Sequence, residues 1–250
     1  MIPETAPAPA PTVTSPRPVL SGRAVPRASL TPRDTESMYR LLDGNFRGVD
    51  AATFQRDLAE KDRVILLEDE RGTLRGFSTF MMYHTRACGR PMVIVCSGDT
   101  IIEPSAWGSP TLPKVWIRSV YEAKRDYPDG DLYWLLLTSG FRTYRFMSVF
   151  CREFIPRHDG PAMPEARRML GILAGERFGS LYDEESGIVR FSMPQALRER
   201  LAIVPEGRYA DPHVRFFLER NPGHAAGDEL VSLASLAHGN LTPAGLRMLR

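Results

Sequence analysis

Three apolar segments separated by short polar turns constrain the fold of this chain more than any other feature. The segments are residues 64–67, 74–83 and 92–102, and the turns are residues 68–72 and 88–91. Polar turns that contain Gly or Pro connect neighbouring antiparallel strands. The sequence therefore predicts three consecutive antiparallel strands, the last of them long.

Further elements are predicted on both sides of this group. Residues 132–138 are the most apolar stretch, which is short enough for a buried strand or a fragment of a core helix. Asp34 is placed to cap one helix, and Pro110, Pro113 and Pro212 favour the first turns of others. Helices are expected at 31–42, 50–60, 110–124, 141–154, 164–177, 195–201 and 211–221, and further short strands at 23–30, 187–191 and 228–234. These elements predict an α/β fold with a mixed, mainly antiparallel sheet flanked by helices.

Composition excludes several classes of protein. The 250 residues carry 32 Lys and Arg against 30 Asp and Glu, so the net charge of +2 offers no basic field for nucleic acid. No apolar run approaches the roughly 18 to 20 residues of a membrane span. The three cysteines lack C-x-x-C spacing, which indicates neither a disulfide framework nor a metal site.

The first 18 residues differ in composition from the rest of the chain. They are rich in Ala and Pro and lack the charged and apolar regions of a secretory signal. Such a composition buries too little apolar surface to fold. We expect a disordered tail at residues 1–18, a single domain at residues 19–250 and a cytoplasmic location.

Three segments follow one another in a recognisable order. Arg75-Gly76-Phe77 enters the second strand of the antiparallel group, the long strand 93–102 leads through residues 105–109 into a helix, and strand 132–138 leads into a helix that contains Tyr144. Over residues 20–235 this order resembles the GNAT superfamily of N-acyltransferases. The resemblance implies a GNAT-like domain that transfers an acyl group from a thioester, acyl-CoA, to an amine of a small molecule or a peptide.

The chain departs from the superfamily at its most specific motif. A Q/R-x-x-G-x-G/A loop, whose backbone N–H groups hold a pyrophosphate, is absent, and the equivalent residues 105–109 contain one glycine, Gly108. The departure leaves three alternatives open: a longer acyl-CoA, an acyl-phosphopantetheine on an acyl carrier protein, or a non-catalytic module that only binds these groups. Residues 139–144 are similar to enzymes that attach fatty acyl groups to amino acids or peptides in bacterial natural-product pathways.

Acyl transfer to an amine needs a base for the ammonium proton and an acid for the leaving thiolate. By the resemblance, His84, Asp99 and Glu103 are candidate bases and Tyr144 is the candidate acid. Each also has a structural interpretation: a solvated turn for His84, a bulge or turn for Asp99, an exposed strand end for Glu103 and a core aromatic for Tyr144. A second alignment places Phe217 at the tyrosine's position instead.

Two segments are candidates for binding the donor, because each precedes or begins a helix whose N-terminal end favours anions. A different chemistry is also open, in which Cys96 takes the acyl group covalently with His84 as its base. No hydrolase, zinc-protease or nucleotide-binding motif is present, and metal dependence is not indicated. The candidate donor-binding residues are Ser105, Trp107, Gly108, Ser109, Ser139, Gly140 and Arg142.

Overall fold

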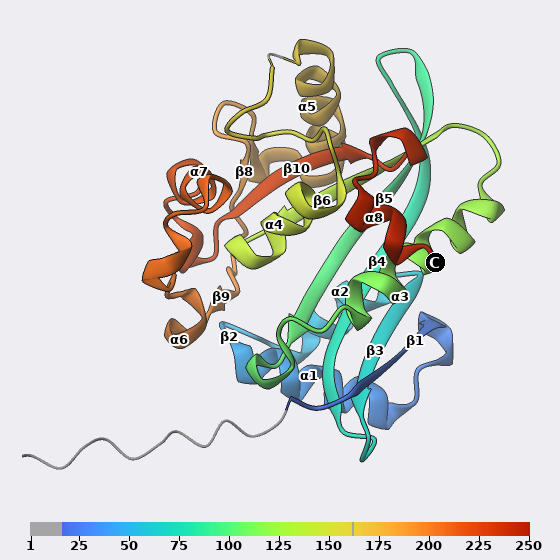
Figure 1. Cartoon of the computed structure of the whole chain (residues 1–250), viewed down its shortest axis with the longest axis vertical. Helices are drawn as coiled ribbons and strands as arrows, with labels where there is room; N and C mark the ends of the chain where they lie inside the picture. Colours follow the sequence, from blue (N-terminus) through green and yellow to red (C-terminus); the bar gives the residue numbers. More distant parts are fainter. Residues whose placement is uncertain (1–16, 162) are drawn as a thin grey trace, which may run out of the picture.

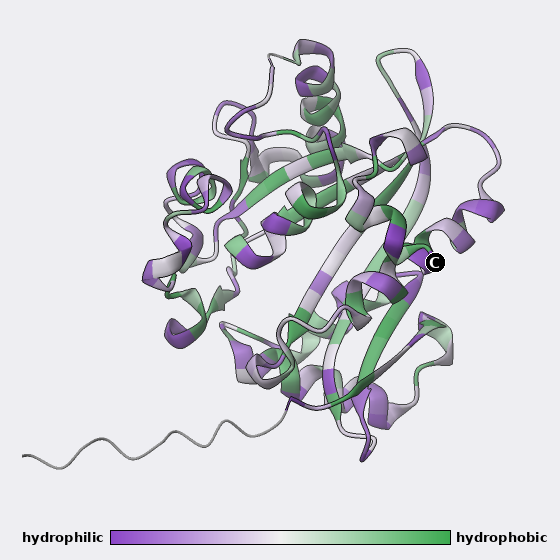
Figure 2. Ribbon diagram, in the orientation of Figure 1, coloured by the Kyte–Doolittle hydropathy of each residue, from purple (hydrophilic) through white to green (hydrophobic). Residues whose placement is uncertain are grey.

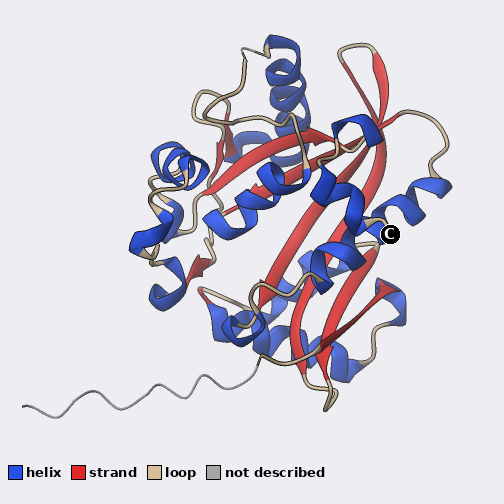
Figure 3. Ribbon diagram, viewed as in Figure 1, coloured by secondary structure: helices blue, strands red, loops and turns tan. Residues whose placement is uncertain are grey.

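The computed structural model describes residues 17–161 and 163–250, so the expected tail falls almost wholly outside the described residues. Over the described part the chain forms a sheet of eight strands in the order β1-β3-β4-β5-β6-β10-β8-β7 (Figures 1 and 3). Its neighbouring strands are antiparallel except β5 and β6, which are parallel. The strands are β1 (Leu20–Pro26), β3 (Arg63–Asp69), β4 (Leu74–Ala87), β5 (Arg90–Ile102), β6 (Asp131–Thr138), β7 (Tyr182–Asp183), β8 (Ile188–Val189) and β10 (Glu229–Ser235), with β2 (Phe46–Arg47) and β9 (Ala196–Leu197) forming a separate pair. The predicted fold class is confirmed.

Helices cover both faces of this sheet. Strand side chains alternate between two faces, and the apolar ones form the core on each side. Figure 2 shows hydrophobic stretches along the central strands. On one face α3, α4, α7 and α8 pack against the sheet, and on the other face α1, α2 and α5 do so. The helices are α1 (Pro32–Asn45), α2 (Ala51–Ala59), α3 (Thr111–Ala123), α4 (Phe141–Phe150), α5 (Pro164–Phe178), α6 (Glu199–Ala202), α7 (Pro212–Arg220) and α8 (Pro243–Met248).

Several element boundaries differ from the sequence prediction, for identifiable reasons. The N-cap of α1 is Thr31, with Asp34 completing a capping box from within the helix. Instead of a helix at 195–201, Leu197 pairs with Phe46, and only Glu199–Ala202 is helical. The helix after β6 ends at Phe150, because the next residue enters a β-bridge with the C-terminal segment. Long-range pairing therefore overrides local helical pattern at both places.

The parallel strands β5 and β6 separate part-way along their length (Figure 1). They pair only where Met92–Cys96 lies beside Asp131–Leu135. Beyond this point β5 stays paired with β4, and β6 stays paired with β10. At the root of the gap the Trp134 indole donates a hydrogen bond of 2.7 Å to Ser97 Oγ. Residues 97–102 of β5 and 136–138 of β6 therefore face each other without pairing, and the backbone groups on these two edges form no ladder with the opposite strand.

A β-bulge in β5 lies at this gap. Ser78 pairs with Thr100 and Phe80 pairs with Ser97, so Gly98 and Asp99 both lie opposite Thr79. A Cβ at position 98 would collide with Thr79 Oγ1 and with the Lys61 side chain, so a larger residue there would have to displace these two side chains. Bulges redirect side chains at the residues they involve. This one turns Asp99 toward the face that carries α2 and α5.

Within residues 17–161 and 163–250, no helix combines the length and apolar character needed to cross a membrane.

Candidate active site

The gap between β5 and β6 opens into a cavity of about 880 Å³. The two strand edges form its floor, and the segments that lead into α3 and α4 form one wall. Charged side chains of α2 and α5 form the wall on the other face of the sheet. The apolar residues of the lining include Phe178, Leu181, Phe191, Met193, Leu197 and Leu201. The cavity is thus reached from both faces of the sheet at the place where the two strands part.

Two carboxyl groups lie in this cavity. Asp99 comes from the bulge in β5, and Glu229 is the first residue of β10. Burial raises the pKa of Asp99 to about 6, with Lys61 acting in the opposite direction. Burial also raises the pKa of Glu229 to about 8, and the charge of Asp99 adds to that rise. Near neutral pH Asp99 is therefore mostly ionised and Glu229 mostly protonated, which separates the two groups into a base and an acid.

Basic side chains of α5 and the α2–β3 turn lie beside these carboxyl groups. Arg177 pairs with Glu60 at 2.5 Å, and its Nε is buried without a hydrogen-bond partner among the described residues. Cys96, at the floor, is buried, and burial raises the pKa of its thiol. A thiol in that state is a poor nucleophile. The site is therefore organised around carboxyl groups rather than around the cysteine.

The opposite wall contains the beginnings of two helices. α3 starts after Pro110 and α4 starts after Gly140. The guanidinium of Arg142, in α4, lies 4.0 Å from the centre of the Trp107 ring, in the segment before α3, so this contact links the two helix starts. Arg142 also donates a 3.0 Å hydrogen bond to the Leu201 carbonyl. Burial lowers the pKa of Arg142, and Arg208 lowers it further. Two helix N-termini together with two guanidinium groups favour an anion at this wall.

The cavity contains most of the residues singled out from the sequence, and it excludes four of them. The bulge proposed for Asp99 exists, and it is the feature that places Asp99 in the cavity. The residues that line the cavity are Cys96, Asp99, Trp107, Gly108, Ser109, Ser139, Gly140 and Arg142, and those outside it are His84, Glu103, Ser105 and Tyr144.

His84 is not past the end of a strand as the sequence suggested, because β4 continues to Ala87. It pairs with Val93, whose side chain is in the core beneath α3, whereas Cys96 is in the core beneath α5. Cross-strand partners share a face of the sheet. His84 and Cys96 therefore lie on opposite faces, and the geometry contradicts a Cys96–His84 pair.

The other three excluded residues have structural partners. Glu103 binds Arg75 at 2.8 Å and accepts a 3.3 Å hydrogen bond from Ser105 Oγ. Tyr144 is fully buried, and its hydroxyl donates a 2.8 Å hydrogen bond to the Pro156 carbonyl. Burial raises the pKa of that hydroxyl. We therefore leave Glu103, Ser105 and Tyr144 out of the proposed site.

Among the cavity residues that were not recognised from the sequence are Lys61, Arg177 and Glu229. Lys61 lies in the turn after α2 and Glu229 begins a strand, which are ordinary positions for charged residues. Glu229 reaches Asp99 only because β10 lies next to β6, a pairing that joins segments about ninety residues apart. A local sequence pattern does not show which residue of a distant strand will lie beside Asp99.

Comparison with known proteins finds distant structural likenesses. No protein-family model matches the chain, and no curated protein matches it significantly. A protein from Enterococcus faecalis, described as a probable N-acyltransferase, gives a TM-score of 0.41 at 12% identity over 54% of this chain, which spans 33% of that protein. An acyl-CoA N-acyltransferase from Pseudomonas aeruginosa gives 0.39 at 16% identity, with 53% of this chain and 88% of that one covered.

A third likeness is to a GNAT family N-acetyltransferase from Escherichia coli solved in complex with CoA. Its TM-score is 0.36 at 16% identity, with 56% of this chain and 72% of that one covered. Likenesses this distant assign the chain no activity, substrate or partner.

Proposed function

We propose that this protein is an N-acyltransferase that moves an acyl group from a thioester donor to an amine. The observation that carries the proposal is the cavity at the β5–β6 gap. It has an anion-favouring wall on one face of the sheet and the Asp99–Glu229 pair on the other. A donor and an acceptor that enter from opposite faces would meet between the strands.

The donor that fits this cavity is a thioester of phosphopantetheine, either in acyl-CoA or on an acyl carrier protein. The arm of this group contains two amides, and the strand edges at residues 97–102 and 136–138 offer backbone partners for an extended amide chain. Its phosphate would lie at the starts of α3 and α4, beside Arg142. The apolar part of the cavity, which includes Phe178 and Met193, supports a long acyl chain.

Asp99 and Glu229 divide the proton transfers between them. The Asp99 carboxylate takes a proton from the ammonium group, and the freed amine attacks the thioester carbonyl to form a C–N bond. Unpaired N–H groups at the edge of β5 stabilise the oxyanion. The C–S bond then breaks, and Glu229, protonated near neutral pH, supplies the proton that the thiolate takes up. The nitrogen gives its second proton to the Glu229 carboxylate as the amide forms, and Asp99 releases its proton to solvent, so both groups return to their starting states.

The proposal is tested by combining donor binding with thiol release. Thermal unfolding is followed with CoA, acetyl-CoA and a long-chain acyl-CoA, since a ligand at a hundredfold excess over its Kd stabilises the folded state by about 2.7 kcal/mol. Thiol release is then measured with a panel of amines. We expect Asp99→Asn to lower turnover by about 100-fold or more while donor binding stays unchanged, since general base catalysis is worth about 10²–10⁴.

Asp131→Asn is the matched control, because Asp131 is an exposed carboxylate at the opposite end of the same strand pair. It should bind donor and turn over like the parent. Binding of a thioester without thiol release from any amine would identify a non-catalytic binding module. Equal turnover in Asp99→Asn and the parent would remove Asp99 from the mechanism.

A further inference from the structure

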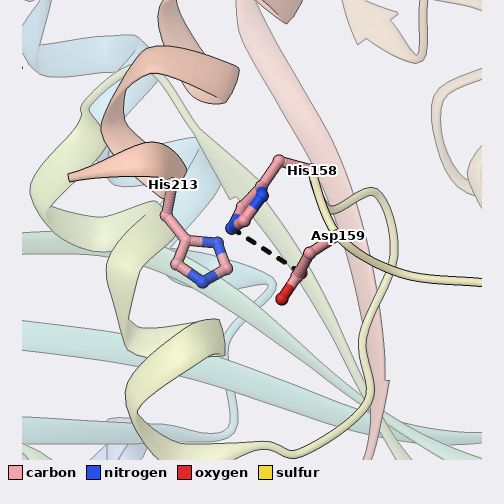
Figure 4. A group of neighbouring side chains, drawn as sticks. All are labelled: His158, Asp159 and His213. Carbon is pink, nitrogen blue, oxygen red and sulfur yellow. Dashed lines mark ion pairs between the residues drawn. The ribbon is translucent and has the colours of Figure 1, made fainter. Parts of the chain in front are cut away.

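Two histidines and an aspartate meet outside the cavity (Figure 4). His158 and Asp159 lie between α4 and α5, and His213 lies in the first turn of α7. One possible ligand atom from each of the three lies within 4.8 Å of the other two. The imidazole centres of His158 and His213 are 4.4 Å apart, and His158 Nε2 is 3.6 Å from Asp159 Oδ1.

The His213 ring supplies a second observation at the same place. Its Nδ1 is buried and has no hydrogen-bond partner among the residues that the structure describes. A buried ring nitrogen without a partner is unfavourable, so such an atom calls for a ligand. Figure 4 shows the ring next to His158 and Asp159, where a bound ion would meet all three side chains.

The surrounding contacts hold these side chains in place. The His213 backbone N–H donates a 3.0 Å hydrogen bond to Asp211, which caps α7, and the His213 ring packs 5.7 Å from that of Phe154. Arg157 Nε donates a 2.6 Å hydrogen bond to Asp159 Oδ1. Arg157 also offsets part of the carboxylate charge. Two imidazoles and one partly neutralised carboxylate favour an ion that binds mainly nitrogen ligands. They do not favour Mg²⁺ or Ca²⁺, which need several oxygen ligands.

We propose that His158, Asp159 and His213 bind one divalent transition metal ion of the Zn²⁺ type. Two imidazoles and one carboxylate make three of the four positions that Zn²⁺ uses, and the fourth is open to water. The ion would join the segment after α4 to the first turn of α7. Because the Pro156 carbonyl in that segment accepts the Tyr144 hydrogen bond, the ion also braces the helix that forms one wall of the cavity.

The test is equilibrium dialysis of the chelator-treated full chain against Zn²⁺ alone. The parent should bind one ion, and His158→Gln and His213→Gln should each weaken its affinity by about tenfold or more. His238→Gln is the matched control, because His238 is exposed and lies beside Tyr121, away from the cluster. It should retain the parent's affinity.

Two further readouts keep the proposal falsifiable. His158 is exposed, so its variant is expected to fold even if the His213 variant does not, and circular dichroism checks both. Co²⁺ in place of Zn²⁺ should give the visible absorption of a site with nitrogen ligands, which both variants lose. No bound Zn²⁺, or equal affinity in the parent and in His158→Gln, would overturn the proposal. Neither readout depends on acyl transfer, so the metal site and the proposed activity are tested independently.

Discussion

Tyr144 is the residue for which sequence and structure differ most. It follows β6 on the helix where the GNAT resemblance implies a leaving-group acid, yet its hydroxyl points to the Pro156 carbonyl and its ring packs against Phe154 and Phe217. The second alignment places Phe217 at the position of the acid, and the Phe217 ring is buried in the same apolar cluster as Tyr144. Neither side chain lines the cavity.

Tyr144→Phe should therefore act on stability and not on catalysis. Loss of the hydrogen bond to Pro156 should lower the free energy of unfolding by about 1 kcal/mol, while donor binding and thiol release remain at the parent's level. Denaturant unfolding and the thiol assay measure the two effects. A large loss of turnover with unchanged stability would show that Tyr144 protonates the thiolate after all.

Asp99 shows what residue-level patterns can predict. The sequence Ser97-Gly98-Asp99 at the end of a long strand allowed both a bulge and a catalytic base, and a bulge is indeed what puts the carboxylate into the cavity. Glu229 lay beyond such reasoning, since its partner is brought near only by strand pairing across the sheet. The cluster at His158 and His213 was missed for the same reason, because its two parts are far apart in the chain.

At the scale of elements, the bulge in β5 depends on one glycine. Gly98→Ala would press a Cβ into Thr79 and Lys61, which forces the bulge to shift and moves Asp99. We expect the free energy of unfolding to fall by about 1 to 3 kcal/mol and turnover to fall with it. Chemical denaturation and thiol release are the measurements.

Gly175→Ala is the control for this substitution. Gly175 lies within α5 with open space where a Cβ would be, so alanine there should leave stability unchanged or raise it by up to about 1 kcal/mol. Equal stability in Gly98→Ala and Gly175→Ala would show that the bulge does not need glycine.

Elements with a strong local signal were predicted well, and those that depend on distant partners were not. The strands β3, β4, β5 and β6 were expected from apolar runs and turns, and all four are present. The pair of β2 with β9 and the helix α8 were not expected. The strands β2 and β9 are fixed by pairing with each other across the chain, which a local pattern does not contain. The helix α8 was overlooked although Thr242 caps it and Pro243 lies in its first turn, which is a local signal.

For the whole molecule, the two cavity carboxyl groups make stability depend on pH. Burial raises the pKa of Glu229 to about 8, above the value of about 4.3 expected in the unfolded chain. The folded state therefore holds the proton more tightly, and its stability should fall as pH rises between these two values. Asp99 acts in the same direction up to about pH 6.

Glu229→Gln removes the larger contribution to this pH dependence of stability, because glutamine does not titrate. Between about pH 5 and pH 9 the melting temperature of the variant should fall less than that of the parent, and at the alkaline end the variant should be the more stable protein. Melting curves across this range measure the difference, with Asp131→Asn keeping the parent's slope. Parallel curves for the parent and Glu229→Gln would mean that Glu229 titrates alike in the folded and unfolded chain.

The short ladder between β5 and β6 also divides the sheet into two parts. Five pairs of residues form the seam between two plates, one that ends in β5 and one that begins with β6. The helix α8 contacts α3 on the first plate and α4 on the second, and it borders the cavity, so it joins the two plates beside the opening. Residues that carry none of the cavity's chemistry therefore hold its two sides together.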